Sequence, residues 1–279
     1  MLSHISAFPF LSSRRPLVFA HRGGAALAPE NTFAAFDNGL ALGADGLELD
    51  VHLSRDGQVV VHHDATLERT TNLRGPVSEW AADELRRADA AYSFERGGLY
   101  PFRGTGCGVP TLAEVLARYH NTPVIIEMKV NSSEMARATI EVVRAAHALG
   151  RVCLGSFRLR VLRAVRALEP AMATSAAREE VRWALYRSWC RWPVARAKYQ
   201  GYQVPEWAGS TRVVSPAFVR AAHAANLAVQ VWGVDTEQDA RRLLQWRVDA
   251  LITDRPDLLV PLARAVHAPS TTPSTSFDA

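Results

Sequence analysis

Histidine and arginine end an apolar run near the start of the chain, in the stretch VFAHRGGAALAPENT from residue 18 to residue 32. His21 and Arg22 are both potential cations, and two glycines follow them directly. A simple loop needs no such residues, whereas a site for an anionic substrate needs positive charge beside a flexible backbone. The stretch therefore indicates a site for an anion.

Carboxylates alternate with apolar residues on two later runs. In GLELDVHL, Glu48 and Asp50 point to the same face, because strand side chains alternate, and Glu127 and Lys129 alternate in the same way in VIIEMKV. Three converging carboxylates would repel one another and raise one another's pKa. One hard divalent cation, Mg²⁺ or Ca²⁺, removes that conflict if Glu48, Asp50 and Glu127 are its ligands. The alternative is a buried salt-bridge network in which Lys129 and Arg22 neutralise the cluster.

A third apolar run, QVVVHH, ends on two histidines. His63 shares a face with Val59 and Val61, and His62 lies on the opposite face. On any single strand such polar residues fit a half-exposed sheet. Across the set they fall late in runs that otherwise look buried on both faces, and the carboxyl ends of barrel strands are where active sites form.

Short apolar runs alternate with helical patterns through most of the chain. Helices are expected over 32–43 and over about 132–148, and the run at 58–63 is an excursion from the main pattern. About eight strand–helix units remain, which favours an α/β fold of the TIM (β/α)8 barrel type over an open doubly wound sheet. The expected strands are 16–20, 46–53, 58–63, 122–130, 151–156, 171–175, 202–206, 227–234 and 249–254.

Composition restricts the class of protein. The 279 residues are 48% hydrophobic and 22% charged, which suffices for a large core and excludes global disorder. The net charge of +4 is spread along the chain without a nucleic-acid reader motif, so no nucleic-acid partner is expected. Cys107, Cys153 and Cys190 are far apart and odd in number, which disfavours a disulfide framework or a structural zinc site.

The ends of the chain differ from its middle. Residues 1–16 form an N-terminal extension that lacks the order of a secretory signal, and 17–266 form the barrel domain. The Ser/Thr/Pro-rich segment 267–279 is expected to be a disordered tail. No uninterrupted apolar window is long enough for a spanning helix, so a cytoplasmic location is expected. The sequence does not indicate an oligomeric state.

Several motifs together resemble the glycerophosphodiester phosphodiesterase family. The resemblance covers about residues 17–260, and its order and spacing are highly specific. It implies a TIM barrel with a small insertion after the second strand, which fits 58–110. The motifs are AHRGG, PENT, GADGLELDVHLSRDGQVVVHHDATLERTT, PTLAEVL, IIEMK, VWGVD and DALITDRPDLL.

The resemblance implies an activity and a role for each site residue. Such enzymes hydrolyse small glycerophosphodiesters to glycerol 3-phosphate and an alcohol with Mg²⁺ or Ca²⁺. His21 and His63 would be the catalytic acid–base pair, and the three carboxylates would be the metal ligands. Arg22 and Lys129 would contact the phosphate. Trp232 is either a ring that stacks on the glycerol carbons or an aromatic residue of the core.

This chain also departs from the family pattern. The usual pattern around Trp232 is closer to VWTVN, whereas Gly233 and Asp235 stand here. The departure concerns the alcohol end of the pocket and leaves the metal centre intact.

An unusual segment, 178–206, holds three of the seven tryptophans interleaved with arginines. The plain interpretation is a barrel helix with its tryptophans inward and its arginines in solvent. The alternative is that 178–200 covers the pocket mouth and contacts a membrane peripherally, which would favour lysophospholipids cut as by a lysophospholipase D. A non-catalytic phosphodiester-binding protein is a third alternative, which the survival of both histidines and all three carboxylates disfavours.

Overall fold

The computed structural model describes residues 13, 15–190, 192 and 197–265. The expected tail at 267–279, and residues 1–12 of the expected extension, lie outside the described residues. Among the described helices, none is long and apolar enough to cross a membrane.

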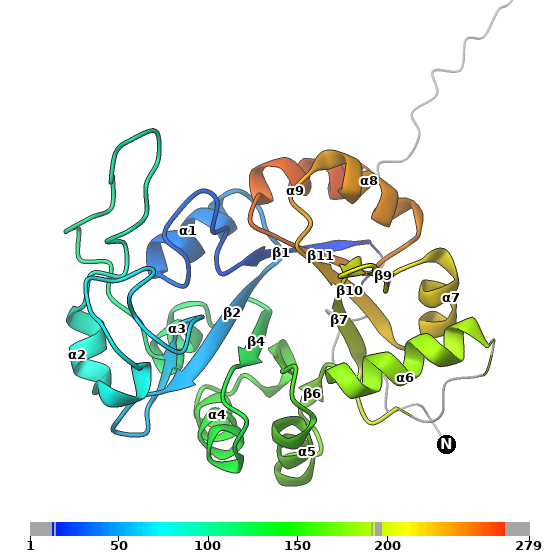
Figure 1. Cartoon of the computed structure of the whole chain (residues 1–279), viewed down its shortest axis with the longest axis horizontal. Coiled ribbons are helices and arrows are strands. Elements are labelled where there is room, and N and C mark those ends of the chain that lie inside the picture. Colours follow the sequence, from blue (N-terminus) through cyan, green and yellow to red (C-terminus); the bar gives the residue numbers. More distant parts are fainter. Residues whose placement is uncertain (1–12, 14, 191, 193–196, 266–279) are drawn as a thin grey trace, which may run out of the picture.

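The described residues form a barrel of eight parallel strands surrounded by helices (Figure 1). Neighbouring strands follow the order β6-β5-β4-β2-β1-β11-β10-β7, and a parallel bridge between Ser175 and Gly201 joins the two ends of this row. The expected TIM barrel is confirmed. Its strands are β1 (Leu17–His21), β2 (Gly46–Leu53), β4 (Val124–Met128), β5 (Val152–Gly155), β6 (Ala173–Thr174), β7 (Gly201–Pro205), β10 (Ala228–Trp232) and β11 (Ala250–Thr253).

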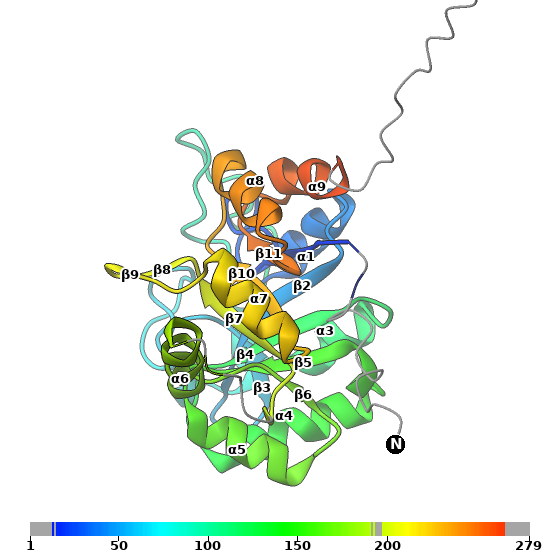
Figure 2. The same ribbon diagram turned by 90° about the vertical axis from the view of Figure 1, so that its right-hand side faces the viewer.

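Each barrel strand is followed by a helix that packs on the outside of the sheet (Figures 1 and 2). Amphipathic helices such as α5 bury one stripe against the strands and leave arginines in solvent. The helices are α1 (Phe33–Ala41), α3 (Leu112–Arg118), α4 (Ser133–Ala145), α5 (Leu159–Leu168), α6 (Arg178–Trp189), α7 (Pro216–Ala224), α8 (Glu237–Gln245) and α9 (Pro256–Ala265), and a single 3₁₀ turn, η4 (Leu149–Arg151), precedes β5.

Two insertions interrupt the strand–helix alternation. The first follows β2 and contains β3 (Val59–Val61), η3 (Val77–Glu79) and α2 (Ala82–Arg87), with β3 antiparallel to β2. The second follows β7 and is a hairpin of β8 (Trp207–Ala208) and β9 (Thr211–Arg212), which the sequence patterns did not predict. Figure 2 shows this hairpin projecting from the same side of the barrel as α6.

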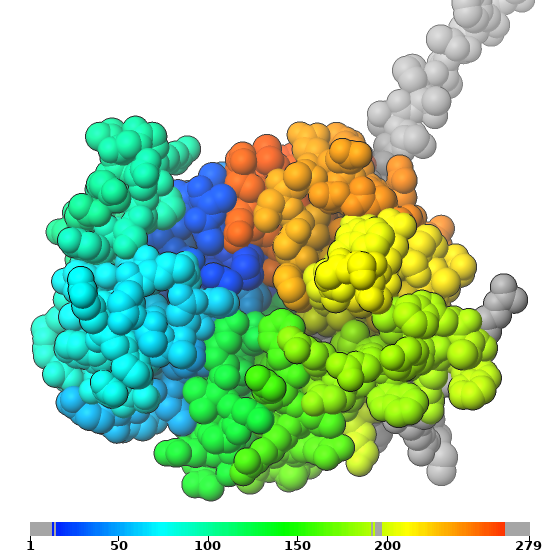
Figure 3. Space-filling model, viewed as in Figure 1, coloured from blue at the N-terminus to red at the C-terminus, as the bar shows by residue number. Residues whose placement is uncertain are grey.

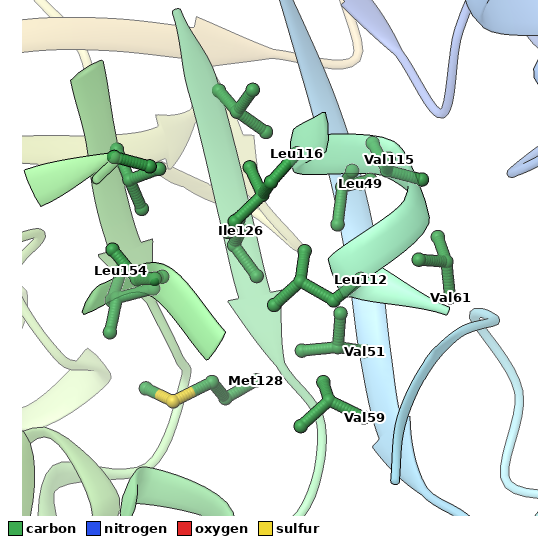
Figure 4. Close-up of a cluster of buried hydrophobic side chains, with 14 of the residues drawn as sticks. Leu49, Val51, Val59, Val61, Leu112, Val115, Leu116, Ile126, Met128 and Leu154 are labelled. Carbon is green, nitrogen blue, oxygen red and sulfur yellow. The ribbon is translucent and has the colours of Figure 1, made fainter. Parts of the chain in front are cut away.

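Alternation along the strands separates an outer core from an inner one. Leu49, Ile126 and Leu154 face the helices and pack with residues of α3 such as Leu112 and Leu116 (Figure 4). The inner core is the lower layer of the barrel interior, made of Leu17, Phe19, Ile125, Cys153, Ala173, Ala228, Ala250 and Ile252. Because inner positions recur every second residue, the next inner position after Phe19 is His21, and the next after Ile125 is Glu127. Polar residues therefore lie directly above an apolar floor.

Candidate active site

Three carboxylates meet above the inner core. Glu48 and Asp50 come from β2 and Glu127 from β4, and each contributes a carboxylate oxygen that lies within 4.8 Å of the others. Asp50 and Glu127 are direct partners in the parallel register of the two strands, which explains their convergence. The predicted cluster is therefore present at the carboxyl ends of the strands.

Cations from the chain border this cluster. The Lys129 Nζ lies 2.8 Å from Asp50 Oδ1 and 3.0 Å from Glu127 Oε2. The Arg22 Nε lies 3.2 Å from Asp50 Oδ2. Asp50 is thus compensated on both oxygens, whereas Glu48 contacts the Arg22 backbone N–H at 3.3 Å and no lysine or arginine head group that the described contacts record.

The pKa directions reflect this unequal compensation. Burial, reinforced by the nearby Asp50 charge, raises the pKa of Glu48 to about 8. Burial likewise raises the pKa of Glu127. Burial also opposes ionisation of Asp50, but Lys129 and Arg22 outweigh it and lower the pKa of that carboxyl. Two of the three carboxylates are therefore under-compensated, and an all-oxygen ligand set with excess negative charge fits a hard divalent cation.

His21 ends β1 and is held by a carboxylate from the far end of the chain. Its Nδ1 lies 2.7 Å from Asp254 Oδ1, and its Nε2 lies 3.7 Å from Glu48 Oε2. Asp254 in turn is placed by Asp235, whose Oδ1 accepts hydrogen bonds from the Asp254 backbone N–H at 2.8 Å and from Thr253 at 2.9 Å. Asp235, which departs from the family pattern, therefore helps to hold Asp254 in place beside His21.

Charges around His21 also govern its protonation. Burial lowers the pKa of His21, but the Glu48 charge and the hydrogen bond to Asp254 outweigh burial and raise it to about 9. The two carboxylates therefore favour the protonated form of the imidazole.

His63 has a separate carboxylate partner. It lies beyond β3, which ends at Val61, and its Nδ1 lies 2.5 Å from Asp64 Oδ1. Arg69 bridges Asp64 and Glu30, with its Nε 2.5 Å from Asp64 Oδ2 and its Nη2 2.7 Å from Glu30 Oε1. Burial lowers the pKa of His63, and the charge of Asp50 only partly offsets it. Arg69 and Asp254 were not singled out from the sequence, although they lie within the motifs HHDATLERTT and DALITDRPDLL.

The PENT segment, residues 29–32, contacts Arg22 and Asp50. Glu30 accepts a hydrogen bond from Arg22 Nη1 at 3.0 Å, and Asn31 donates to Asp50 Oδ2 at 3.0 Å. Thr32 caps α1 by accepting from the Ala35 N–H at 3.3 Å. The loop also needs Gly23, which has φ near 89° and whose absent Cβ would lie 2.6 Å from Ala35. The segment therefore both begins a helix and fixes Arg22 and Asp50.

Trp232 ends β10 and is half-buried against the inner core. Its ring meets Phe157 edge to face at a centroid distance of 6.2 Å. Gly233 follows with φ near 71°, a conformation that favours glycine. Trp232 and Phe157 therefore form an aromatic wall of the site.

A single cavity of about 840 Å³ opens above these residues. Its charged end contains His21, His63, Glu48, Glu127 and Lys129. The other part of the cavity, a mostly apolar arm, is lined from α6 and the β8–β9 hairpin. Residues 191 and 193–196 of the 178–200 segment lie outside the described residues, so covering of the pocket mouth by this segment stays a prediction. This arm is lined by Val181, Leu185, Tyr186, Trp189, Val204, Pro205, Trp207, Ala208 and Val213.

Comparisons with known proteins agree with this geometry. A model of the glycerophosphoryl diester phosphodiesterase family matches residues 21–258. A glycerophosphodiester phosphodiesterase of Caldanaerobacter subterraneus subsp. tengcongensis is 30% identical over 256 residues, which cover 90% of this chain and 98% of that protein.

Solved structures agree as well. A glycerophosphodiester phosphodiesterase of Agrobacterium tumefaciens has a TM-score of 0.72 and 29% identity, covering 88% of this chain and 99% of its own. A phosphodiesterase of Oleispira antarctica, solved with the product sn-glycerol-3-phosphate, has a TM-score of 0.70 and 26% identity, covering 91% of this chain and 99% of its own. The barrel, its carboxylate cluster and these similarities together show that the chain belongs to the glycerophosphoryl diester phosphodiesterase family.

Proposed function

We propose that the chain is a metal-dependent glycerophosphodiester phosphodiesterase that releases glycerol 3-phosphate and an alcohol. The observation that carries this proposal is that two histidines, His21 and His63, line one cavity together with Glu48 and Glu127, which cluster with the buried Asp50. Glu48, Asp50 and Glu127 would hold one divalent cation, Mg²⁺ or Ca²⁺. When bound, that cation supplies positive charge to the nonbridging oxygens of the phosphodiester.

The chain's own cations complete the phosphate site. Arg22 and Lys129 line the cavity beside the carboxylates. They can therefore contact a phosphate in the cavity while keeping their ion pairs with Asp50. Fixed positive charge stabilises the transition state because it need not reorganise during the reaction. The half-buried Trp232 offers an apolar ring to the glycerol carbons.

The two histidines are proposed to move the protons. In each, a carboxylate accepts from Nδ1–H, which leaves Nε2 for the substrate. His21 takes the proton from the attacking glycerol hydroxyl, and His63 gives a proton to the leaving alkoxide. A cyclic phosphate forms as the bond to the alcohol breaks, and water then opens it.

A general base must be neutral and a general acid must be protonated. Without metal, the pKa of His21 is raised to about 9 and that of His63 is lowered, which is the opposite of what these roles require. The largest contribution that raises the pKa of His21 is the charge of Glu48. Glu48, with its charge compensated as a metal ligand, would no longer raise the pKa of His21, and the neutral, basic imidazole would be favoured.

Metal dependence is tested on glycerophosphocholine with Mg²⁺ or Ca²⁺ and with EDTA. We expect EDTA to abolish turnover and added metal to restore it. The Glu127→Gln variant should bind metal more weakly in calorimetry and lose most activity, because one anionic ligand is gone. Glu141→Gln, on the exposed face of α4, is the matched control. Unchanged metal affinity in Glu127→Gln would refute the ligand assignment, and substrate binding without turnover would indicate a non-catalytic binding protein.

Lysophospholipids are a second candidate substrate class, favoured by the apolar arm of the cavity. Ligand cavities of roughly 300–1,000 Å³ accommodate drug-sized molecules, and a glycerophosphodiester is smaller than these. A lysophospholipid carries the same phosphodiester and a free glycerol hydroxyl beside it. We expect turnover of lysophosphatidylcholine but not of diacyl phosphatidylcholine, which lacks that hydroxyl. Turnover of glycerophosphocholine alone would restrict the enzyme to deacylated substrates.

A further inference from the structure

Large aromatic side chains are exposed around the outer end of the cavity. Their exposed fractions range from 49% to 69%, although aromatic residues of this size are usually largely buried. We call them the aromatic rim. Its members are Trp183, Tyr186, Trp189, Trp192 and Trp207.

The rim arises because α6 presents its aromatic face to solvent. Ala184 and Leu185 are the buried residues of α6, a helix that lies wholly in the described part of the chain. Trp183, Tyr186 and Trp189 recur every three residues and touch in series, with ring centroids 6.4 and 5.6 Å apart. The interpretation that these tryptophans point inward is therefore wrong, since Trp183 is 69% exposed and Trp189 is 59% exposed.

The rim is also the lip of the substrate cavity. Tyr186 and Trp189 line the cavity from α6, and Trp207 lines it from the hairpin on the other side. Figure 3 shows the lime-coloured α6 and the yellow hairpin side by side on the front of the molecule. A surface that holds this lip would therefore lie directly over the entrance to the site.

Positive charge accompanies the rim. From Val181 to Pro205 the sequence contains five basic residues and no Asp or Glu. Arg178 and Arg182 line the cavity. The Arg212 guanidinium lies 5.0 Å from the ring centroid of Trp207, although it also pairs with Glu206 at 2.9 Å. Acidic residues of this helix are confined to its first turn, where Glu180 pairs with Arg166 at 2.7 Å.

We propose that the aromatic rim docks onto the surface of an anionic lipid bilayer. Tryptophan and tyrosine favour the interface between lipid head groups and acyl chains, and arginines between them pair with anionic head groups. A second copy of the chain is a less fitting occupant, because two such surfaces would bring like charges together. The docking itself rests on the rim alone, while its use for turnover rests on the proposed function.

Vesicle sedimentation of the full chain, with no substrate present, tests this proposal. We expect binding to phosphatidylcholine vesicles containing phosphatidylglycerol, and at least about tenfold weaker binding to phosphatidylcholine alone or in high salt. Trp183→Ser/Trp192→Ser should weaken binding about tenfold or more, because two interfacial side chains are lost. Neither residue lines the cavity.

Two control variants separate docking from folding and from catalysis. Leu99→Ser/Tyr100→Ser removes exposed apolar residues from the β2–α3 insertion, across the molecule from α6, and should bind vesicles like the original chain (Figure 1). Glu127→Gln should also bind normally, so that failure of hydrolysis and failure of docking are distinguishable. Equal binding by the rim variant and the original chain would overturn the proposal. So would a dimer in sedimentation velocity that the rim variant converts to a monomer.

Discussion

Each histidine at the cavity has its own carboxylate partner, and neither partner belongs to the carboxylate cluster. His21 is held by Asp254 from the end of β11, and His63 by the adjacent Asp64. A carboxylate can only accept at Nδ1, so both rings present Nε2 to the cavity. The two side chains are therefore oriented independently and can be tested independently.

Changing the leaving group separates the roles of the two histidines. A general acid raises the reaction rate about 10²- to 10⁴-fold, and only where the leaving group needs a proton. His63→Ala should therefore lose most activity on glycerophosphocholine but much less on a glycerophosphoryl nitrophenyl ester, because a nitrophenolate leaves without a proton. His21→Ala should lose activity on both substrates, because attack fails whichever group departs.

Steady-state rates of both variants on both esters provide the measurement. His62→Ala is a matched control, since that neighbouring ring contacts the Thr66 carbonyl instead of the cavity. A loss in His63→Ala that is equal for the two esters would remove the general-acid role. A leaving-group-dependent loss in His21→Ala instead would exchange the two roles.

At the scale of elements, the insertion after β2 completes the site. Its strand β3 pairs antiparallel with β2, which brings His63 over the carboxylates that β2 carries. Arg69, later in the same insertion, joins Asp64 to Glu30 of the PENT segment. A charged chain thus connects His63 to Arg22 through residues from two separate loops.

Arg69→Met should therefore act as a weaker form of the His63 substitution. Without Arg69, Asp64 loses its link to Glu30 and no longer holds the His63 ring in one position. Misplacement of a catalytic group by about 1 Å can cost about 10²-fold in rate. We expect kcat on glycerophosphocholine to fall by roughly that factor, with a smaller loss on the nitrophenyl ester. Arg86→Met is the control, since its ion pairs are with Asp83 of α2 and Glu114 of α3 and involve neither Asp64 nor Glu30. Equal losses on the two esters would mean that Arg69 acts through stability or phosphate binding.

Sequence patterns predicted most elements but not those that depend on distant partners. The strands at 46–53 and 249–254 were found within one residue of each end, because their apolar runs are buried on both faces. The β8–β9 hairpin was missed because its two-residue strands carry no apolar alternation. The sequence left two interpretations of α6 open, because helical spacing gives a face but not the side on which the barrel lies.

At the scale of the whole molecule, closure of the barrel decides which residues can meet. The convergence of Glu48, Asp50 and Glu127 could be predicted, because adjacent strands carry them at inward positions. The expected barrel already places the first and last strands side by side, but it does not specify which residue after the last strand reaches His21, so the contact with Asp254 was not predicted. Such contacts between ends of the chain appear only once the sheet closes.

The reactivity of the Cys153 thiol can be used to measure how readily the barrel opens. It lies on β5 in the inner core, and burial raises the pKa of its thiol to about 12. At pH 8 the group is therefore protonated, and only a thiolate attacks a disulfide reagent. The other two cysteines are accessible, since Cys190 is exposed and Cys107 is half-exposed.

An aromatic disulfide reagent at pH 8 should therefore titrate two thiols in the native protein and a third only after unfolding. In low denaturant the third thiol should react at a rate set by opening of the barrel, because the native interior excludes the reagent. Cys153→Ala should leave the native count at two and reduce the unfolded count from three to two. Rapid reaction of three thiols in native protein would mean that the barrel opens readily. The weakest junction is that between β6 and β7, where a single bridge between Ser175 and Gly201 joins the ends of the strand row.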